Sequence, residues 1–424
     1  MRKSKIFLII IIVFCGNNLN AQNLINSPYS RFGVGDLQSN VSPQFAAMGG
    51  TSIASYNPNI LNPYNPASYT TFKPNYFIFF AGGSHKTTNM FTTDLDQTTN
   101  YTSFSHLILG FPLTKKMGAS AGIIPFSNIG YVLEDDTLLD NIGLVNYEYN
   151  GDGGLNVLYV GTAYRLSENL SLGANANYLF GRLDRNSKVI FNDDESFNTR
   201  TSKSISIKGF YYQLGLLYNK NIDEKRHITI GITSNNNTEI SAKESVITEI
   251  YDIVSSIYEV VKDTTENTTS GFTNSMLFPQ NIAFGISFNM DKKWLLAADY
   301  STRKWSDYRI FGETDELINS SSFSGGLQYT PDYNAINKYW KLIKYRFGGK
   351  FAQSYLQLNN TQLTEKSISL GFGLPLRKTK SDIDLSVEMG QRGTVNKSLI
   401  KEQFLRFRIG LNLKDIWFVK RKYD

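Results

Sequence analysis

The feature that most constrains the fold of this chain is a strict alternation of apolar and polar residues. In LSLGANANYLF, residues 170–180, apolar side chains recur at every second position, and Ser171, Gly173, Asn175 and Asn177 lie between them. Successive side chains of a β-strand point to opposite faces, so this period predicts a strand whose faces meet different environments. The pattern predicts about fourteen strands. They begin near residues 74, 103, 118, 154, 170, 204, 226, 280, 294, 322, 344, 366, 382 and 402.

The connections between these strands alternate in length. Short turns such as 114–117 and 167–169 follow the even-numbered strands, and long polar stretches such as 128–153 and 235–279 follow the odd-numbered ones. This sorting is typical of an outer-membrane barrel, whereas a soluble β-sandwich alternates without sorting its loops by side. We predict an all-β fold: a transmembrane antiparallel β-barrel of about fourteen strands over residues 72–424, located in the bacterial outer membrane.

The start of the chain predicts export. A basic start, an apolar run of about ten residues and Ala21 at a plausible cleavage position form the pattern of a signal peptide over residues 1–21. The run is too short to span a bilayer, and Phe14 before Cys15 disfavours lipidation. Cys15 is the one cysteine, so we expect a mature chain without disulfides or thiol chemistry.

Charge and histidine content argue against two function classes. The first 21 residues hold three of the 43 Lys and Arg and no acid, which leaves 43 − 3 = 40 basic against 37 acidic side chains. This balance gives no reason to expect a nucleic-acid partner. His85, His106 and His227 lie in no motif with Ser or Asp, and no Cys/His cluster has metal spacing. We expect no enzyme, cofactor or metal, with a barrel hydrolase as the remaining catalytic alternative.

The segment before the first strand is rich in turns yet apolar. SIASYNPNILNPYNPASYTTF, residues 52–72, holds three Asn-Pro pairs, which exclude both a helix and an ordinary strand. A barrel of this size leaves a lumen, and irregular backbone is allowed at membrane depth when protein surrounds it. We predict that residues 22–71 enter the lumen from the periplasmic side as a plug, or hatch, that buries Ile60 and Tyr64. A loose periplasmic tail is the alternative.

A family resemblance supports the hatch. AMGGTSIASYNPNILNPYNPASY, residues 47–69, resembles the start of FadL-type outer-membrane transporters for long-chain fatty acids and other hydrophobic compounds. Those proteins carry a Gly-rich hatch that ends in Asn-Pro-Ala just before the first strand, and residues 65–67 stand at the matching place. The resemblance implies a fourteen-stranded barrel and passive uptake of a ligand of the fatty acid or hydrocarbon class. The candidate hatch and ligand-contact residues are Asn57, Ile60, Tyr64, Asn65 and Pro66.

The third strand carries a proline. In GIIPFSNIG, residues 122–130, Pro125 lies where a ladder hydrogen bond is expected, which favours an edge or a bulge. In FadL-like proteins the third strand kinks inward and opens a gap through which an apolar ligand leaves sideways into the membrane. The resemblance therefore makes Pro125 and Phe126 candidates for a lateral opening. The alternative places Pro125 at the external rim, where pairing has ended.

Two features depart from the family. Glu388, Arg406 and Arg408 are predicted to face the lumen, where they suit apolar cargo poorly and could clamp the hatch through charge-assisted bonds. The chain also ends in a basic cluster at Lys420–Lys422, which we interpret as a solvated tail or a docking site for a periplasmic or membrane protein. The expected partners are otherwise outer-membrane lipid and a hydrophobic small molecule. The alternative function is a non-transporting barrel subunit of an outer-membrane assembly or secretion complex.

Periodicity leaves one segment undecided. Residues 244–261 fit an amphipathic helix, with Ile250, Ile253 and Ile257 on one side, about as well as strand extensions above the membrane.

Overall fold

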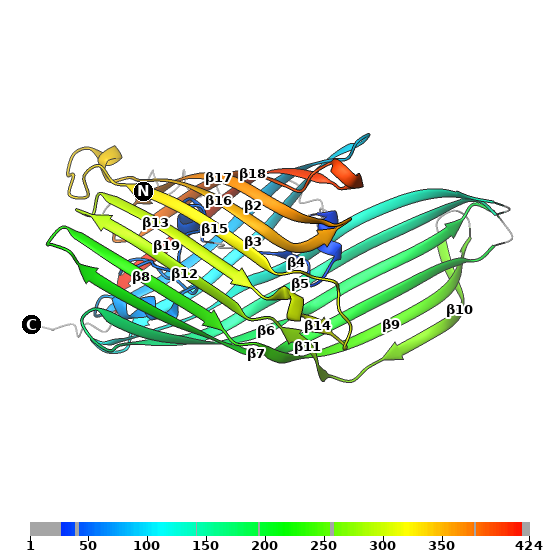
Figure 1. Ribbon diagram of the computed structural model, residues 1–424, viewed down its shortest axis with the longest axis horizontal. Helices are drawn as coiled ribbons and strands as arrows, with labels where there is room; N and C mark the ends of the chain where they lie inside the picture. Colours follow the sequence, from blue (N-terminus) through cyan, green and yellow to red (C-terminus); the bar gives the residue numbers. More distant parts are fainter. Residues whose placement is uncertain are drawn as a thin grey trace, which may run out of the picture.

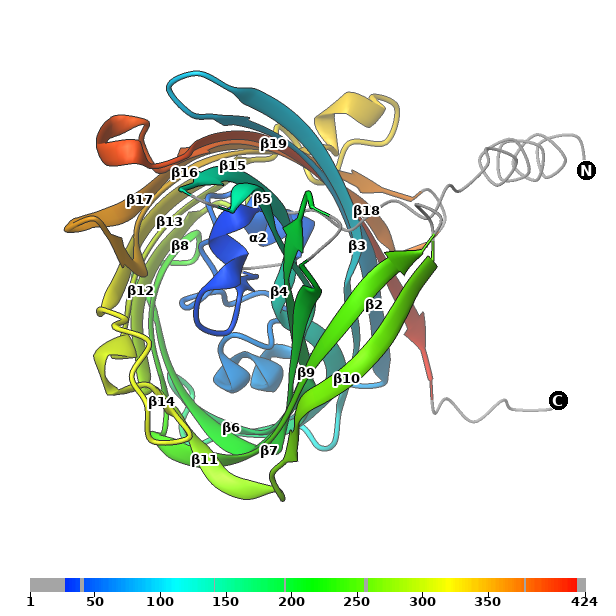
Figure 2. The same ribbon diagram turned by 90° about the vertical axis from the view of Figure 1, so that its right-hand side faces the viewer.

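The chain folds into a closed antiparallel β-barrel. The computed structural model describes residues 27–38, 42–140, 142–193, 196–254, 258–376 and 379–417, so the predicted signal peptide and the cluster Lys420–Lys422 lie outside the described residues. The last barrel strand pairs with the first and closes a ring of 14 strands (Figure 2). In ring order the strands are β2 (Tyr76–Phe91), β3 (Asp96–Pro112), β4 (Met117–Leu139), β5 (Gly143–Arg165), β6 (Leu170–Phe191), β7 (Asn198–Asn221), β8 (Arg226–Asn235), β12 (Asn281–Met290), β13 (Trp294–Arg303), β15 (Ser320–Tyr329), β16 (Lys344–Leu358), β17 (Thr361–Pro375), β18 (Asp382–Arg392) and β19 (Lys401–Ile416).

The predicted barrel and its strand count are confirmed, but several predicted loops are strands. Much of the predicted connections 84–102, 128–153 and 186–203 forms extended hairpins that continue β2 to β7 beyond the ring. Both faces of a strand outside the membrane meet water, so these stretches need no alternation of apolar and polar residues and have the composition of loops.

Residues 244–254 and 258–261 are strands, so the helix alternative is wrong. β9 (Thr238–Val254) pairs with the upper half of β7 and with β10 (Tyr258–Thr269), and β11 (Thr273–Phe278) joins β9 to the two-residue β14 (Arg309–Ile310). Together with β4 to β7, β9 and β10 form a sheet that projects from one end of the barrel (Figure 1). We call this the long-strand end, and the opposite end the short-turn end.

The two faces of the wall have opposite character. Outward side chains are apolar and exposed, for example Leu214 at 61%, Leu370 at 56% and Ile409 at 56%. Inward positions on the same strands carry buried polar groups such as Asn175 and Ser369. This is the arrangement of a barrel that faces lipid outside and polar groups inside. No helix in the described ranges is long and apolar enough to cross a membrane.

The N-terminal segment lies within the ring (Figure 2). Residues 42–72 fill the short-turn half of the lumen, and we call them the hatch. They contain α2 (Pro43–Ala46) and the 3-10 turn η2 (Pro66–Thr71). Residues 27–38, which we call the strap, lie toward the long-strand end and contain η1 (Pro28–Arg31) and β1 (Asp36–Leu37). The boundaries of the predicted division into residues 1–21, 22–71 and 72–424 stay a prediction. The remaining short elements are η3 (Trp305–Asp307), η4 (Tyr339–Lys341) and η5 (Asn396–Ser398).

Candidate functional site

The three Asn-Pro pairs fold the hatch into successive turns by one mechanism. Proline has no backbone N–H, and in each pair the preceding Asn side chain accepts the amide of the residue after the proline. The amides of Asn59, Tyr64 and Ala67 donate to the side-chain oxygens of Asn57, Asn62 and Asn65 at 2.9, 3.1 and 3.1 Å. This explains how an apolar segment without regular structure satisfies its own backbone.

Polar side chains of the wall hold the hatch. The carboxylate of Asp299 on β13 accepts the successive amides of Ser52 and Ile53 at 2.6 and 2.9 Å. The amide of Gly49 donates to Ser369 Oγ on β17 at 3.0 Å, and Ser287 Oγ on β12 donates to the carbonyl of Ala54 at 2.8 Å. Further bonds come from β5, β6, β7 and β19. They involve Arg165, Ser171, Asn175, Gln213, Leu216 and Asn412.

The hatch also approaches the wall backbone closely. Gly49 has φ of +70°, and a Cβ there would lie 2.3 Å from the carbonyl oxygen of Gly349. Leu61 is fully buried. These contacts show that the hatch packs closely against the wall in the short-turn half of the lumen.

The strap follows the free edge of β4. The amide of Ser27 donates to the carbonyl of Gly130 at 3.1 Å, and the amide of Gln38 donates to the carbonyl of Phe126 at 2.9 Å. Between these bonds, Asp36 pairs with Asn128 and Leu37 pairs with Ser127 in antiparallel register. The strap therefore acts as a short additional strand on β4.

A charged cluster on β18 and β19, on the far side of β2 and β3 from β4, anchors the strap. Arg392 on β18 binds Asp36 at 2.5 Å and lies 3.6 Å from Glu402 on β19, and Ser27 Oγ donates to the same Glu402. Tyr29 Oη donates to the carbonyl of Ile400 at 2.6 Å and accepts its amide at 2.9 Å. The strap thus links β18 and β19 on one side to β4 on the other.

The wall is interrupted where the strap lies. β3 and β4 pair from Pro112–Gly118 to Leu107–Ile123, and within residues 96–140, all of which are described, no β3–β4 pair follows. A β-bulge between Pro125 and Ser127 makes Phe126 an extra residue opposite β5. Pro125 lies inside β4 and still pairs with Asn156 of β5, so at Pro125 strand pairing has ended only on the β3 side. We call the interval beyond Ile123 the wall gap.

A cavity of about 370 Å³ lies inside the barrel beside the wall gap. Its lining combines an apolar side, at Ile124, Pro125, Phe126 and Tyr211, with a hydroxyl-rich side that includes Ser322. Hatch and strap residues also contribute to its lining, namely Asp36, Leu37, Gln38, Ala46, Gly49, Gly50, Ser52, Ile53, Pro63 and Tyr64.

One cation faces this cavity without an acidic partner. The guanidinium of Arg303 lies 5.4, 5.6 and 5.7 Å from the ring centroids of Phe126, Phe278 and Trp305. Within the described residues it forms neither a hydrogen bond nor an ion pair. Cation–π contacts with the three rings thus hold the Phe126 side chain in place at the wall gap.

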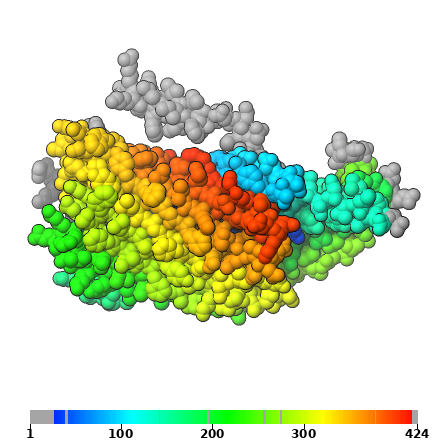
Figure 3. Space-filling model, turned by 45° about the horizontal axis from the view of Figure 1, so that its top comes forward, coloured from blue at the N-terminus to red at the C-terminus, as the bar shows by residue number. Residues whose placement is uncertain are grey.

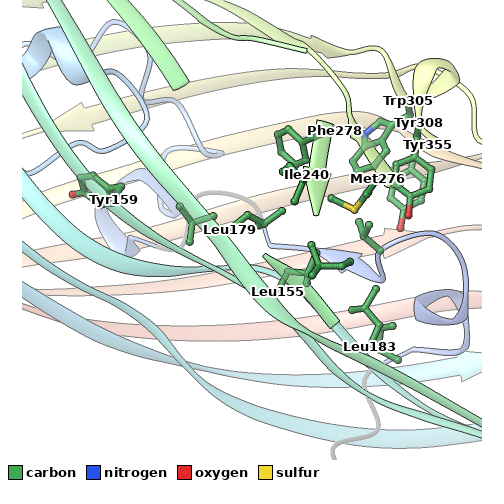
Figure 4. Close-up of a cluster of buried hydrophobic side chains, with 14 of the residues drawn as sticks. Leu155, Tyr159, Leu179, Leu183, Ile240, Met276, Phe278, Trp305, Tyr308 and Tyr355 are labelled. Atoms are coloured by element: carbon green, nitrogen blue, oxygen red, sulfur yellow. The ribbon is translucent and has the colours of Figure 1, made fainter. Parts of the chain in front are cut away.

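Packed side chains close the lumen toward the long-strand end (Figure 4). Phe278 stacks on Tyr211 with ring centroids 4.7 Å apart, and Trp305 lies 4.7 Å from Tyr355. The cluster also contains Leu155, Leu179, Leu183, Ile240, Met276 and Tyr308. The hatch closes the other end of the lumen. The cavity is therefore least enclosed at the wall gap, where β3 and β4 are not paired.

The three predicted lumen charges bind one another. Glu388 accepts from Arg408 at 2.7 Å and from Arg406 at 3.3 Å, and all three line the cavity. The hypothesis that they clamp the hatch is therefore corrected: Glu388 binds both arginines within β18 and β19, because neighbouring strands place them side by side. An ion pair does reach the N-terminal segment, between Arg392 and Asp36.

The candidate residues from the sequence fall into two sets. Tyr64, Pro125, Phe126, Glu388, Arg406 and Arg408 line the cavity. Asn57, Ile60, Asn65 and Pro66 do not line it, and Asn57 and Asn65 instead shape the hatch. Sequence reasoning missed Asp299, Arg303 and the strap anchors. A signal was present for Asp299, which is an acid at an inward position of an alternating strand.

The histidines have structural surroundings. His106 is buried against Phe80, with ring centroids 4.3 Å apart, and its Nδ1 lies 2.9 Å from Ser105 Oγ. Within the part of the chain that the structure describes, no group of three or more His, Cys, Asp or Glu side chains could hold a metal ion.

Comparison with known proteins gives a family and a fold. The model of the family described as BamG matches residues 1–424. No curated protein matches this chain. The toluene transporter TodX of Pseudomonas putida superposes with a TM-score of 0.63 at 14% identity, covering 91% of this chain and 100% of that one.

Two further solved structures are similar. The CymD monoaromatic hydrocarbon channel gives a TM-score of 0.59 at 15% identity, covering 91% of this chain and 99% of its own. A Pseudomonas aeruginosa FadL homologue gives 0.56 at 9% identity, covering 91% of this chain and 100% of its own. At these identities the likeness concerns the fold, and it confirms the FadL-type architecture that the hatch motif indicates.

Proposed function

We propose that this chain, which belongs to the BamG family, is an outer-membrane channel for passive passage of hydrophobic small molecules. In this proposal the short-turn end faces the periplasm and the long-strand end faces the cell exterior. Support comes from the outward apolar face of the wall and from the fold shared with the toluene transporter TodX and the CymD monoaromatic hydrocarbon channel.

The observation that carries the proposal is the wall gap beside the cavity. Pro125 and Phe126 border both, so an apolar molecule in the cavity has a short path sideways into lipid. Passage requires only differential binding along this path, with no chemical step. In the conformation described here the strap covers the gap, and we propose that it must leave β4 before a ligand passes.

Because the predicted mature chain lacks cysteine, an engineered disulfide can test this path. Leu37 and Ser127 are register partners, so Leu37→Cys with Ser127→Cys should lock the strap onto β4. Val387→Cys with Phe407→Cys is a matched control, because these register partners face outward on β18 and β19. The assay is uptake of radiolabelled toluene, and separately of a radiolabelled long-chain fatty acid, by cells without other such channels.

We expect the wild type and the control pair to raise uptake above that of cells without the protein. The locked pair should abolish this increase, and a reductant should restore it. Folded wild-type protein in the outer membrane that raises uptake of neither probe would overturn the proposal.

The second candidate function is a non-transporting subunit of an outer-membrane assembly. One observation favours it: Lys350, Glu365, Glu388 and Arg406 make one side of the cavity charged, which suits apolar cargo poorly. Absence of uptake, together with stoichiometric partner proteins after purification from native membranes, would support this candidate.

A further inference from the structure

One connection at the short-turn end differs from its neighbours. The other described connections there are tight turns at 113–116, 166–169, 222–225 and 291–293, whereas residues 330–343 form a longer loop between β15 and β16. We call it the β15–β16 loop. Its backbone is internally bonded: the amide of Asp332 donates to the carbonyl of Lys341 at 3.0 Å. Compact, self-bonded loops of this kind are frequently functional.

This loop exposes large apolar side chains. Ile336 is 92% exposed, Trp340 54% and Tyr333 43%. Figures 1 and 2 both place the loop, coloured yellow to gold, outside the ring of strands at the short-turn end. In the space-filling view the yellow chain forms a corner of the molecule at this end (Figure 3).

Hydrogen bonds hold the loop along the outer rim. Tyr345 faces outward next to Phe372, with ring centroids 5.8 Å apart, and its hydroxyl donates to the carbonyl of Trp340 at 3.0 Å. Tyr339 Oη donates to the carbonyl of Pro375 at the end of β17 at 3.0 Å. The exposed side chains are therefore level with the aromatic rim of the wall, where Trp294 and Tyr329 lie with ring centroids 4.2 Å apart.

Unpaired lysines surround these side chains. Lys292 lies 5.3 Å from the ring centroid of Tyr333, and Lys341 lies 5.9 Å from that of Trp340. Neither of them, nor Lys338, forms an ion pair within the described residues. A patch of cations beside exposed aromatic residues complements an anionic, partly apolar surface.

A hollow in the outer wall begins directly above the loop. It has a volume of about 510 Å³ and is lined by apolar side chains that include Ile286, Leu296, Leu327 and Phe347. Leu327 and Phe347 are register partners two residues from Tyr329 and Tyr345, which flank the loop. The hollow extends the apolar surface of the loop along the outer wall. Its apolar lining suits a lipid acyl chain.

We propose that the β15–β16 loop and this hollow bind an anionic phospholipid of the periplasmic leaflet. The headgroup phosphate lies on Lys292, Lys338 and Lys341, one acyl chain occupies the hollow, and Ile336 and Trp340 insert at the interface. The inference rests on the proposed membrane placement but on no transport activity. It identifies a site at which lipid composition controls how the protein sits in the membrane.

The test is spin-label accessibility in the full chain. Labels at Ile336→Cys, Phe347→Cys and Glu224→Cys report the loop, the lipid-facing wall and a water-exposed turn. The protein is placed in vesicles of phosphatidylcholine alone or mixed with phosphatidylglycerol, and collision with oxygen and with an aqueous nickel chelate is measured. We expect nickel access at residue 336 to be several-fold lower than at residue 224, with the larger drop in phosphatidylglycerol.

Matched lysine variants test the charge. Lys338→Ala with Lys341→Ala should remove the effect of phosphatidylglycerol at residue 336, whereas Lys115→Ala with Lys116→Ala, in the turn 113–116, should leave it unchanged. Nickel access at residue 336 equal to that at residue 224, with residue 347 still lipid-exposed, overturns the inference while the membrane placement stands. A label that is protected from both reagents only in native membranes also overturns it, in favour of a protein partner.

Discussion

The hatch and the strap are neighbouring parts of one N-terminal segment, but they are attached in different ways. The hatch meets the wall backbone to backbone, as at Gly49, and receives bonds from β5, β6, β7, β12, β13, β17 and β19. The strap pairs with one strand edge, and side chains from three parts of the wall hold it. These are the cluster around Arg392, Arg185 on β6, which donates to the carbonyls of Arg31 and Gly33, and Tyr355 on β16, which donates to the carbonyl of Gly35. The hatch is part of the barrel's packing, and we expect the strap to detach while the barrel stays folded.

The difference follows from the kind of contact. Close packing cannot be exchanged for water without leaving voids, so its loss affects the whole fold. Edge hydrogen bonds exchange with water at small net cost. The ion pair between Arg392 and Asp36 is buried, so it separates at small cost only if both charges become hydrated when the strap leaves. Four substitutions test this contrast, and they are ordered by their expected effect on global stability.

Gly49→Ala should have the largest effect. Residue 49 has positive φ, and the new Cβ would lie 2.3 Å from the carbonyl oxygen of Gly349. We expect a loss of about 3 kcal/mol in the free energy of unfolding, measured by urea titration in lipid vesicles. Gly325→Ala is the control, because nothing lies within 4 Å of its added Cβ, and it should leave stability unchanged. Equal stability of both variants would contradict a tightly packed hatch.

Asp299→Ala should follow. It removes the acceptor of two hatch amides, those of Ser52 and Ile53, and we expect a loss of about 2 kcal/mol. Hydrogen exchange of these two amides should rise with it. Ser287→Ala removes one neutral bond to the hatch and should cost about 1 kcal/mol. If amide hydrogen exchange at residues 52 and 53 stays slow in Asp299→Ala, packing alone holds this part of the hatch.

Gly35→Ala is the strap counterpart of Gly49→Ala. Residue 35 also has positive φ, and the new Cβ would lie 2.6 Å from the carbonyl oxygen of Asn128. We expect the strap to leave β4, with a change in global stability below about 1 kcal/mol. Maleimide labelling of a Ser127→Cys background should rise several-fold, because Ser127 is buried when the strap is in place. A global loss as large as that of Gly49→Ala would break the comparison.

Tyr29→Phe should have the smallest global effect. It removes both bonds between the Tyr29 hydroxyl and the backbone of Ile400. We expect about 1 kcal/mol of local destabilisation and no measurable change in global unfolding. Hydrogen exchange should rise several-fold at residue 400 and within residues 27–38. Unchanged exchange there would mean that the bonds from Arg392, Arg185 and Tyr355 anchor the strap without Tyr29.

The barrel could be predicted from the sequence because its wall has a lipid side and a polar side. Each strand that crosses the membrane therefore alternates apolar and polar residues. It also reached the hatch, because three Asn-Pro pairs among apolar residues exclude regular structure yet require burial. It identified Pro125, since proline within a strand marks a bulge.

The strap could not be predicted in the same way. Its only pairing with β4 covers residues 36–37, which is too short to show an alternating pattern. Its anchors Arg392 and Glu402 lie more than 350 residues along the chain from Asp36 and Ser27. Arg303 was equally hidden, because the rings around it come from β4, β11 and η3, which only the closed ring brings together. The extended hairpins beyond the ring were missed because polar strands outside a membrane have the composition of loops.

The position of residues 27–38 and 42–72 inside the ring also constrains how the chain assembles. The barrel closes along the seam between β19 and β2, which runs from Lys401–Phe91 to Ile416–Tyr76. The segment that fills the lumen precedes β2 in the chain, so it exists before the strand that completes the ring. We expect the nascent wall to fold as an open, curved sheet around this segment, and zipping of the final seam to be the last step of biogenesis. The hatch would then serve as the template on which the barrel acquires its curvature.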